Sequence, residues 1–437
     1  MLPLILILTL QGGATLPQGS PAPRRPVDAA ARRLPSAEAL LEAAADRRNS
    51  AEERMRALES LATSELPVPL EPLLALKNSI QRPWLAAYVR CLGRTDAGAL
   101  PTLERYARQR EADVRAEAVY AITRLDRDGG EAFAREILRN DKEPPPARVA
   151  ALRGLSDRNS MFARVEAVRR LATADGAVLL EALAVLRREP RLDDVPYLID
   201  VLESRSGRPA NEAVRLLQEL TGYRIGNEPR TWKYFMLRHR MAETDFRREP
   251  QPGEEEPATL TYFGIPLMGE RVAFVLDSSG SMNEGLYGRR GHTKGSMAVQ
   301  ELLPLLPRLP ATGAFDVVFF TSSTSSFGKG ALAERSDENI DRISDWLRRH
   351  QFEGGTDVAA GMDEAFQRDG VEEIVLLSDG MPSGGAPGMD QVLMRARQWN
   401  RWRNVRIHAI FLGDNVDARN WLARLAAENG GVCRVIQ

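Results

Sequence analysis

The stretch 271–282 reads RVAFVLDSSGSM and decides the fold of the C-terminal part of this chain. Its first half, 272–276, is a short and continuously apolar run, which is typical of a strand buried on both faces of a parallel sheet. An Asp-x-Ser-x-Ser loop follows directly. In open α/β sheets, ligands bind beyond the carboxyl ends of the strands, so we expect a binding site at this loop.

Two later stretches are expected at the same edge of the predicted sheet. Residues 354–357 read GGTD, a glycine turn that opens a helix, and residues 374–380 read IVLLSDG, a second apolar strand that ends in an acid. The first loop offers three oxygen-bearing side chains within five residues, and Gly280 lets its backbone curl so that they converge. We therefore expect the three stretches to meet at one site.

Together these stretches resemble a von Willebrand factor type A domain with a complete metal-ion-dependent adhesion site, extending over about 271–437. The resemblance implies a domain that binds one divalent cation. In the family, the two serine hydroxyls contact the metal directly, the threonine does so directly or through water, and the aspartates act largely through water. Carried over to this sequence, the metal site consists of Asp277, Ser279, Ser281, Thr356 and Asp379.

Such a site implies a particular metal and a particular partner. Oxygen-only ligands with retained waters favour Mg²⁺, with Mn²⁺ as a substitute. Because most of the inner ligands are neutral, the cation keeps much of its positive charge and an open position that an Asp or Glu of a protein partner can fill. Two alternatives stay open: the loop is only a polar turn in which Asp277 caps a helix, or the metal is structural and has no partner.

Composition limits the class of protein. The chain has 437 residues, of which 43% are apolar and 27% are charged, which indicates two or three globular domains. A formal net charge of −1 gives no electrostatic reason to expect a nucleic-acid partner. Cys91 and Cys433 fall in different predicted domains, so we expect free thiols and no disulfide. No sequence feature indicates an oligomeric state.

Residues 1–17 are predicted to be a signal peptide. Their apolar run, 2–10, is too short to span a bilayer, because a transmembrane helix needs about 20 residues. It has the length of a signal-peptide core, and small residues near Ala14 suit cleavage, although no Lys or Arg precedes the run. We expect export, and the alternative is a cytoplasmic chain with an uncleaved apolar tail. Residues 18–35, rich in Pro, Ala and Arg, are predicted to be a disordered lead-in.

Residues 36–242 change to leucine, alanine and arginine at helical spacing. The stretches LPTL (100–103) and VPYL (195–198) each place a proline in the first turn of a helix, where its missing amide does no harm. Helix pairs that recur at about 30–45 residues indicate a solenoid, and the region resembles HEAT or armadillo repeats. The alternative is an irregular helical bundle. The aromatic stretch 220–241 is predicted to cap the last repeat.

The proline-broken acidic stretch 243–262 is predicted to be a flexible linker and domain boundary. After it, apolar runs alternate with helical patterns, which predicts a doubly wound, Rossmann-like α/β domain at 263–437 that follows the all-α repeat region. Strands are expected at 259–267, 272–276, 315–320, 374–377, 405–412 and 432–436, a polar turn at 321–326, and helices at 296–306, 337–349, 357–367, 390–402 and 418–428.

Enzyme motifs are weak or missing. The glycine-bearing loop 285–294 ends in HTK but lacks the Gly-Lys-Ser/Thr order of a nucleotide-binding loop. His292 could be drawn into a Ser-His-Asp arrangement, but the neighbouring serines are better explained as metal ligands and a lone loop histidine is usually exposed. His408, inside an apolar strand, is expected to be a core residue with its hydrogen bonds satisfied.

We therefore interpret the chain as a non-enzymatic adhesion or scaffold protein. Its metal would hold an acidic residue of a protein partner, and the loops 283–293 and 381–389 would supply specificity. The alternative is the metal-site subunit of a chelatase or a MoxR-type AAA+ ATPase complex, which would place the chain in the cytoplasm. A metal-dependent hydrolase ranks last.

Overall fold

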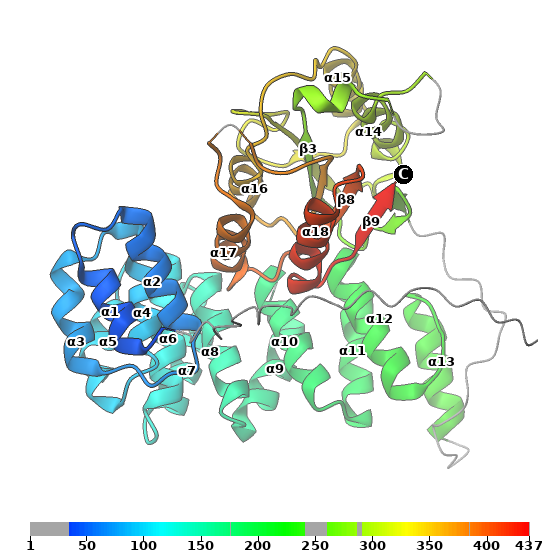
Figure 1. Cartoon of the computed structure of the whole chain (residues 1–437). Helices are drawn as coiled ribbons and strands as arrows, with labels where there is room; N and C mark the ends of the chain where they lie inside the picture. The colour runs from blue at the N-terminus through cyan, green and yellow to red at the C-terminus, as the bar shows by residue number, and fades with distance from the viewer. Residues whose placement is uncertain (1–34, 175, 241–259, 286–290, 384, 437) are drawn as a thin grey trace, which may run out of the picture. The chain divides into compact units, whose positions relative to one another are not determined.

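The structure, a computed structural model, describes residues 35–174, 176–240, 260–285, 291–383 and 385–436 (Figure 1). The predicted signal peptide, nearly all of the predicted lead-in and most of the predicted linker lie outside these ranges. The elements below belong to one compact unit, Ala37–Gln437. Among the described helices, none has both the length and the apolarity that a membrane span requires.

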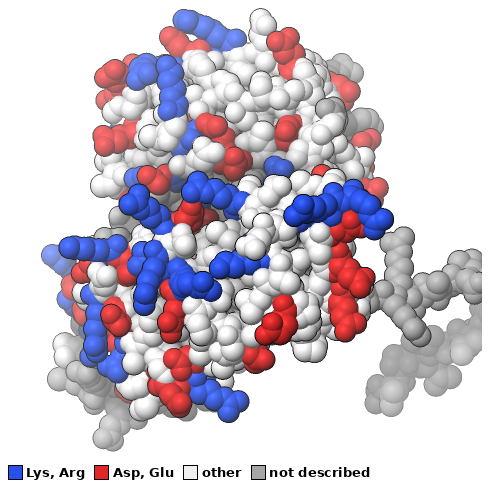
Figure 2. All heavy atoms as spheres, turned by 90° about the vertical axis from the view of Figure 1, so that its left-hand side faces the viewer, with Lys and Arg blue, Asp and Glu red and all other residues white. Residues whose placement is uncertain are grey.

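The surface carries charges of both signs. The chain contains 59 Lys and Arg against 60 Asp and Glu, and on the face drawn in Figure 2 the basic side chains are interspersed with acidic ones. Mixed charge of this kind does not create the extended basic field that favours nucleic acid.

The N-terminal part of the described chain is all-helical, as predicted. Its α-helices are α1 (Ala37–Ala45), α2 (Ala51–Thr63), α3 (Leu70–Ala75), α4 (Leu85–Leu92), α5 (Leu100–Tyr106), α6 (Ala112–Leu125), α7 (Gly130–Arg139), α8 (Pro145–Asp157), α9 (Met161–Thr173), α10 (Gly176–Arg188), α11 (Val195–Ser204), α12 (Gly207–Thr221) and α13 (Pro229–Arg240). The expected prolines occupy the first turns of α5 and α11, and Gly222 ends α12 with a left-handed φ of 75°.

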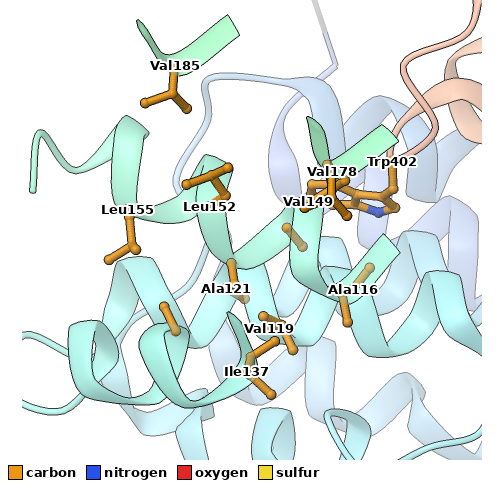
Figure 3. Packing of buried hydrophobic residues seen from close by; sticks show 14 of the residues in the cluster. Ala116, Val119, Ala121, Ile137, Val149, Leu152, Leu155, Val178, Val185 and Trp402 are labelled. Atoms are coloured by element: carbon orange, nitrogen blue, oxygen red, sulfur yellow. The ribbon is translucent and has the colours of Figure 1, made fainter. Parts of the chain in front are cut away.

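These helices pack in two layers. The even-numbered helices from α2 to α12 pack successively on one another, and α7, α9, α11 and α13 do the same. Neighbours in sequence, such as α9 and α10, also pack together as hairpins. Figure 3 shows Val119, Leu152 and Val178, from α6, α8 and α10, within the shared hydrophobic core. The helix-pair arrangement is what the sequence led us to expect, and the resemblance to HEAT repeats remains a prediction.

The C-terminal part is an α/β sheet, also as predicted. Its strand order is β5-β4-β3-β7-β8-β9, and β6 pairs with β4. The five strands β3, β4, β7, β8 and β9 run parallel, whereas β5 and β6 pair antiparallel with β4. The bounds are β3 (Arg271–Asp277), β4 (Ala314–Phe320), β5 (Thr324–Ser326), β6 (Ala333–Glu334), β7 (Glu373–Ser378), β8 (Arg406–Leu412) and β9 (Cys433–Ile436).

Helices cover both faces of this sheet. On β3, Phe274 belongs to a core shared with α14 (Lys294–Leu302) and α15 (Asp337–Arg348). Its neighbour Val275 belongs to the opposite core, shared with α16 (Val358–Phe366), α17 (Met389–Asn400) and α18 (Val416–Glu428). Successive strand residues point to opposite faces, so a strand buried on both sides must be apolar throughout. This explains the run that marked β3 in the sequence.

One strand prediction and one turn prediction were wrong in detail. The expected leading strand at 259–267 is instead a small hairpin of β1 (Thr261–Tyr262) and β2 (Ile265–Pro266) outside the main sheet. Phe263 and Gly264, which join the two strands, have φ values of 49° and 76°, as a two-residue hairpin turn of primed type requires. The expected polar turn at 321–326 contains the antiparallel strand β5.

Trp402 joins residues of the helical region to residues of the α/β region within the compact unit. It is 2% exposed and belongs to the hydrophobic core of the helices (Figure 3). The centroid of its ring lies 5.5 Å from that of the Tyr120 ring. Close by, Arg153 Nη1 donates to the carbonyl of Arg401 at 2.6 Å, and Asn404 Nδ2 donates to the carbonyl of Ala177 at 3.1 Å. The sequence did not predict these contacts.

Both cysteines are free, as expected. His408 lies in the sheet core as predicted, at 3% exposed, but only one of its ring nitrogens is satisfied. Nδ1 accepts a hydrogen bond from the Val432 amide at 3.2 Å, whereas Nε2 is buried without a partner among the described residues. Burial, reinforced by the nearby arginines Arg406, Arg208 and Arg215, lowers the pKa of His408 to about 4.

Replacing His408 with asparagine is expected to make folding less sensitive to acid. Because the folded-state pKa is low, the unfolded chain binds more protons between about pH 6.5 and pH 4, so this histidine costs stability as the pH falls through that window. Between pH 7 and pH 5 the wild type should lose about 1–2 kcal/mol more unfolding free energy than His408→Asn, as measured by urea unfolding. The exposed His292→Asn serves as the control, and equal losses in His408→Asn and the wild type would contradict the prediction.

Candidate metal centre

The five predicted metal ligands come from three segments at one edge of the sheet. Asp277 is the last residue of β3, and Ser279 and Ser281 follow in the loop and in a short 3₁₀ turn, Gly280–Asn283. Asp379 follows β7, the parallel neighbour of β3. Thr356 precedes α16, whose N-terminal cap is Asp357. The carboxyl ends of two adjacent strands thus deliver both carboxylates.

Hydrogen bonds join four of the five residues. Ser279 Oγ lies 3.1 Å from Ser281 Oγ, and Ser281 Oγ donates to Asp379 Oδ1 at 2.9 Å. Asp277 Oδ1 accepts from the Ser279 amide at 2.9 Å, and its Oδ2 accepts from Ser378 Oγ at 2.6 Å. Asp277 therefore fixes the start of the serine loop, residues 278–281, while Asp379 contacts this loop from the end of the neighbouring strand.

Thr356 is placed by its backbone. The loop before it lies against the serine loop, where the Gly280 amide donates to the Gly354 carbonyl at 3.2 Å. The Thr356 amide donates to Ser383 Oγ at 3.1 Å, and the Thr356 carbonyl accepts from the Ser383 amide at 3.0 Å. Thr356 is only 6% exposed, yet its hydroxyl forms no hydrogen bond within the described part of the chain. That hydroxyl is free to bind a ligand.

Burial distinguishes the members of this group. Asp277 is fully buried, and Ser279, Thr356 and Asp379 are nearly so, whereas Ser281 is exposed. Burial raises the pKa of Asp277 to about 6, although hydrogen bonds from Ser378 and Ser279 pull it in the opposite direction. The group is therefore open to solvent on the Ser281 side and closed on the Asp277 side.

The donor set fits a hard divalent cation. Mg²⁺ with metal–oxygen bonds of about 2.1 Å in octahedral geometry separates neighbouring ligand oxygens by about 3 Å. The oxygens of Ser279, Ser281 and Asp379 already have such spacings, at 3.1 and 2.9 Å. No three His, Cys, Asp or Glu side chains of the described residues are grouped to hold a metal. The candidate centre therefore relies on hydroxyls together with two carboxylates.

His350 contacts the serine loop on its buried side. His350 Nε2 lies 2.6 Å from Ser278 Oγ, and its ring stacks on Phe319 with centroids 3.4 Å apart. Burial lowers the pKa of His350 to about 4, so the ring is neutral at pH 7. His292, in contrast, is exposed as predicted. No sequence pattern indicates this role of His350, because 72 positions separate it from Ser278.

Lys294 also belongs to this site, and sequence reasoning missed it. Its ammonium donates to Asp379 Oδ2 at 2.8 Å and to Glu284 Oε2 at 2.7 Å. In the sequence, Lys294 is the last residue of the glycine-bearing loop 285–294, which lacks the order of a nucleotide-binding loop. The available signal was its rarity, since Lys294 is one of five lysines in a chain that otherwise uses arginine for positive charge.

Comparison with known proteins agrees with the fold of this region. Residues 270–435 match the family model described as von Willebrand factor type A domain. Inter-alpha-trypsin inhibitor heavy chain H6 from Homo sapiens is 28% identical over 188 residues, which is 40% of this chain and 14% of that protein. Heavy chain H1 from Homo sapiens is 28% identical over 176 residues, which is 38% of this chain and 18% of that protein. The chain thus spans less than a fifth of either relative.

Solved structures also align with part of this chain. A von Willebrand factor type A protein from Catenulispora acidiphila aligns with a TM-score of 0.33 and 19% identity, covering 40% of each chain. The manganese-loaded TRAP protein of Plasmodium vivax aligns with a TM-score of 0.28 and 19% identity, covering 36% of this chain and 62% of that chain. Residues 270–435 therefore form a von Willebrand factor type A domain on the strength of the family model and the sheet topology.

Proposed function

We propose that this chain is a non-enzymatic binding protein whose type A domain holds Mg²⁺ or Mn²⁺ and captures an acidic side chain of a protein partner. The ligands would be Asp277, Ser279, Ser281, Thr356 and Asp379. The family matched by residues 270–435, with relatives among the inter-alpha-trypsin inhibitor heavy chains, supports a role in protein binding.

One observation carries this proposal. Hydroxyl and carboxylate oxygens from two adjacent parallel strands converge within hydrogen-bonding distance, and Ser281 at their edge is exposed. Hydroxyls are neutral ligands, so a cation held by them keeps positive charge that an incoming carboxylate can neutralise. A site built only for structural stability would gain more from an additional carboxylate and from full burial.

The proposed ligands would have two roles: some would fix the loop that binds the cation, and others would leave the cation accessible to the partner. Asp277 is buried and fixes the serine loop through the Ser279 amide. Ser281 lies on the solvent side, beside Asp379. Thr356 supplies, from a third loop, a hydroxyl that has no hydrogen-bond partner among the described residues. When bound, the cation would supply a positive charge and an open coordination position for the partner's carboxylate. The loops at 283–293 and 381–389, described only in part, would contact the rest of the partner.

The test is capture of partners by the intact chain from the cell fractions in which it occurs. We expect a set of proteins that is retained in Mg²⁺, lost in EDTA and lost with Asp379→Ala. Asp390→Ala, which removes an exposed carboxylate in the first turn of α17, should capture the same set as the wild type. Thermal melting of each variant in EDTA checks that it is folded.

A second step identifies the contact. Replacing single Asp or Glu residues of a captured partner should abolish its retention at one position, whereas replacing other acidic residues should not. Partners retained equally in EDTA and by Asp379→Ala would overturn the proposal and assign binding to another surface, such as the helical region. Metal-dependent capture of a chelatase or MoxR-type ATPase would favour the alternative reading as a subunit of such a complex.

A further inference from the structure

Lys294 is buried in a place where lysine is unusual. The residue is 9% exposed, and lysines are almost never this buried unless they are paired. Here the ammonium is held between two carboxylates, those of Asp379 and Glu284. Asp379 is nearly buried at 8% exposed, whereas the Glu284 side chain is 67% exposed. The inner partner of Lys294 is therefore a predicted metal ligand.

The helix does not explain this lysine. Lys294 is the first residue of α14, and Thr293 caps the helix by accepting from the Ser296 amide at 3.0 Å. A positive charge at a helix N-terminus is opposed by the helix dipole, which favours acids there. A residue that breaks a local preference and is also buried usually serves a site. An ammonium is compact and fits between two carboxylates where a planar guanidinium needs more room.

The two carboxylate oxygens of Asp379 have different partners. Its Oδ1 accepts from Ser281 inside the predicted ligand group, and its Oδ2 accepts from Lys294. Lys294 therefore neutralises the carboxylate without occupying the oxygen that faces the serines. Among the buried groups, the carboxylates of Asp277 and Asp379 and the Lys294 ammonium leave one net negative charge, because the Glu284 side chain is 67% exposed and its charge is screened by water. A divalent cation at this site would therefore carry a net positive charge toward solvent. Without Lys294 the same cation would be neutralised completely.

We propose that Lys294 sets the charge of this site, weakening its hold on the metal while strengthening the capture of a carboxylate by the bound metal. This inference rests on the proposed function, because it requires the cation and the acidic ligand. It makes Lys294 a specificity-determining residue that favours anionic ligands over neutral ones. Its effects on metal and on carboxylate have opposite signs, which a purely structural lysine would not produce.

The experiment uses Mn²⁺ and acetate as probes of the intact chain. Calorimetry measures the Kd for Mn²⁺, and water-proton relaxation of the Mn²⁺-loaded protein measures acetate binding, because acetate displaces metal-bound water. Lys294→Gln removes the charge but keeps a hydrogen-bond donor for Asp379. We expect it to bind Mn²⁺ about tenfold more tightly and acetate several-fold more weakly than the wild type. Lys233→Gln, which removes a lysine whose side chain is 52% exposed, should match the wild type in both measurements.

The outcomes separate this inference from the proposed function. If the wild type binds no Mn²⁺, both are overturned. If the wild type binds Mn²⁺ but Lys294→Gln binds it equally or more weakly, the inference is wrong and the metal site stands. Tighter Mn²⁺ binding without weaker acetate binding overturns the role in ligand capture. A lower melting temperature in EDTA with unchanged affinities would assign Lys294 a structural role only.

Discussion

Replacing Arg368 with methionine is expected to lower the free energy of unfolding by about 3–5 kcal/mol, because it leaves a buried charge unpaired. Arg368 is 2% exposed and its Nε donates to Asp316 Oδ2 at 2.6 Å. Asp316, on β4, is fully buried, and its Oδ1 accepts from the amides of Val317 and Gly328, both at 2.8 Å. Urea unfolding at pH 7 measures the loss.

The controls separate the charge from the volume of the side chain. Arg348→Met removes an arginine of α15 whose side chain is 64% exposed, and it should cost less than about 1 kcal/mol. Asp316→Asn combined with Arg368→Met removes both charges but keeps the acceptor for the two amides, so it should be more stable than Arg368→Met alone. A loss in Arg368→Met no larger than in Arg348→Met would show that the buried pair contributes little.

Adding Mg²⁺ is expected to stabilise the wild type and to have no such effect on Asp277→Asn. A ligand that binds only the folded state at a concentration of 100 Kd adds about 2.7 kcal/mol. Asparagine has nearly the shape of aspartate and still accepts from the Ser279 amide, so the serine loop can keep its position. It lacks the negative charge that the cation requires. Thermal unfolding in EDTA and in increasing Mg²⁺ or Mn²⁺ tests the prediction.

Asp417→Asn is the matched control for that experiment. It changes an exposed carboxylate in the first turn of α18, and it should gain as much stability from Mg²⁺ as the wild type. An equal gain in Asp277→Asn would place the metal elsewhere. No gain in the wild type would mean that the converged hydroxyls and carboxylates do not form a metal centre.

The sheet and the loops that carry the proposed ligands could be predicted from the sequence, because both have local sequence patterns. The apolar runs at β3 and β7 follow from burial on two faces, and each is followed by the acid, Asp277 or Asp379, that the structure places at the sheet edge. The helical region could also be predicted, from the spacing of its apolar residues and from the prolines in the first turns of its helices. In these elements, what a residue does depends mainly on its near neighbours in the chain.

Other features depend on partners far away in the sequence, and these could not be predicted. Lys294 forms a hydrogen bond with Asp379, which lies 85 positions away in the sequence, and Ser383 forms one with Thr356, which lies 27 positions away. Trp402, which follows α17, looks like an ordinary residue of the α/β region, yet it packs into the core of the helices. The hairpin of β1 and β2 was missed for a different reason, since its turn begins with Phe263 at positive φ, a conformation that sequence patterns rarely indicate.

The long separations also bear on how the chain folds. Ser378 and Asp277 are 101 positions apart, and Ser281 and Asp379 are 98 apart, so the ligand group exists only after β3 and β7 have paired. Closing such long loops costs entropy before any contact compensates for it, which makes pairing of this kind slow. The proposed metal site should therefore assemble with the last refolding phase of the sheet, well after the local helix pairs of α1–α13 have formed.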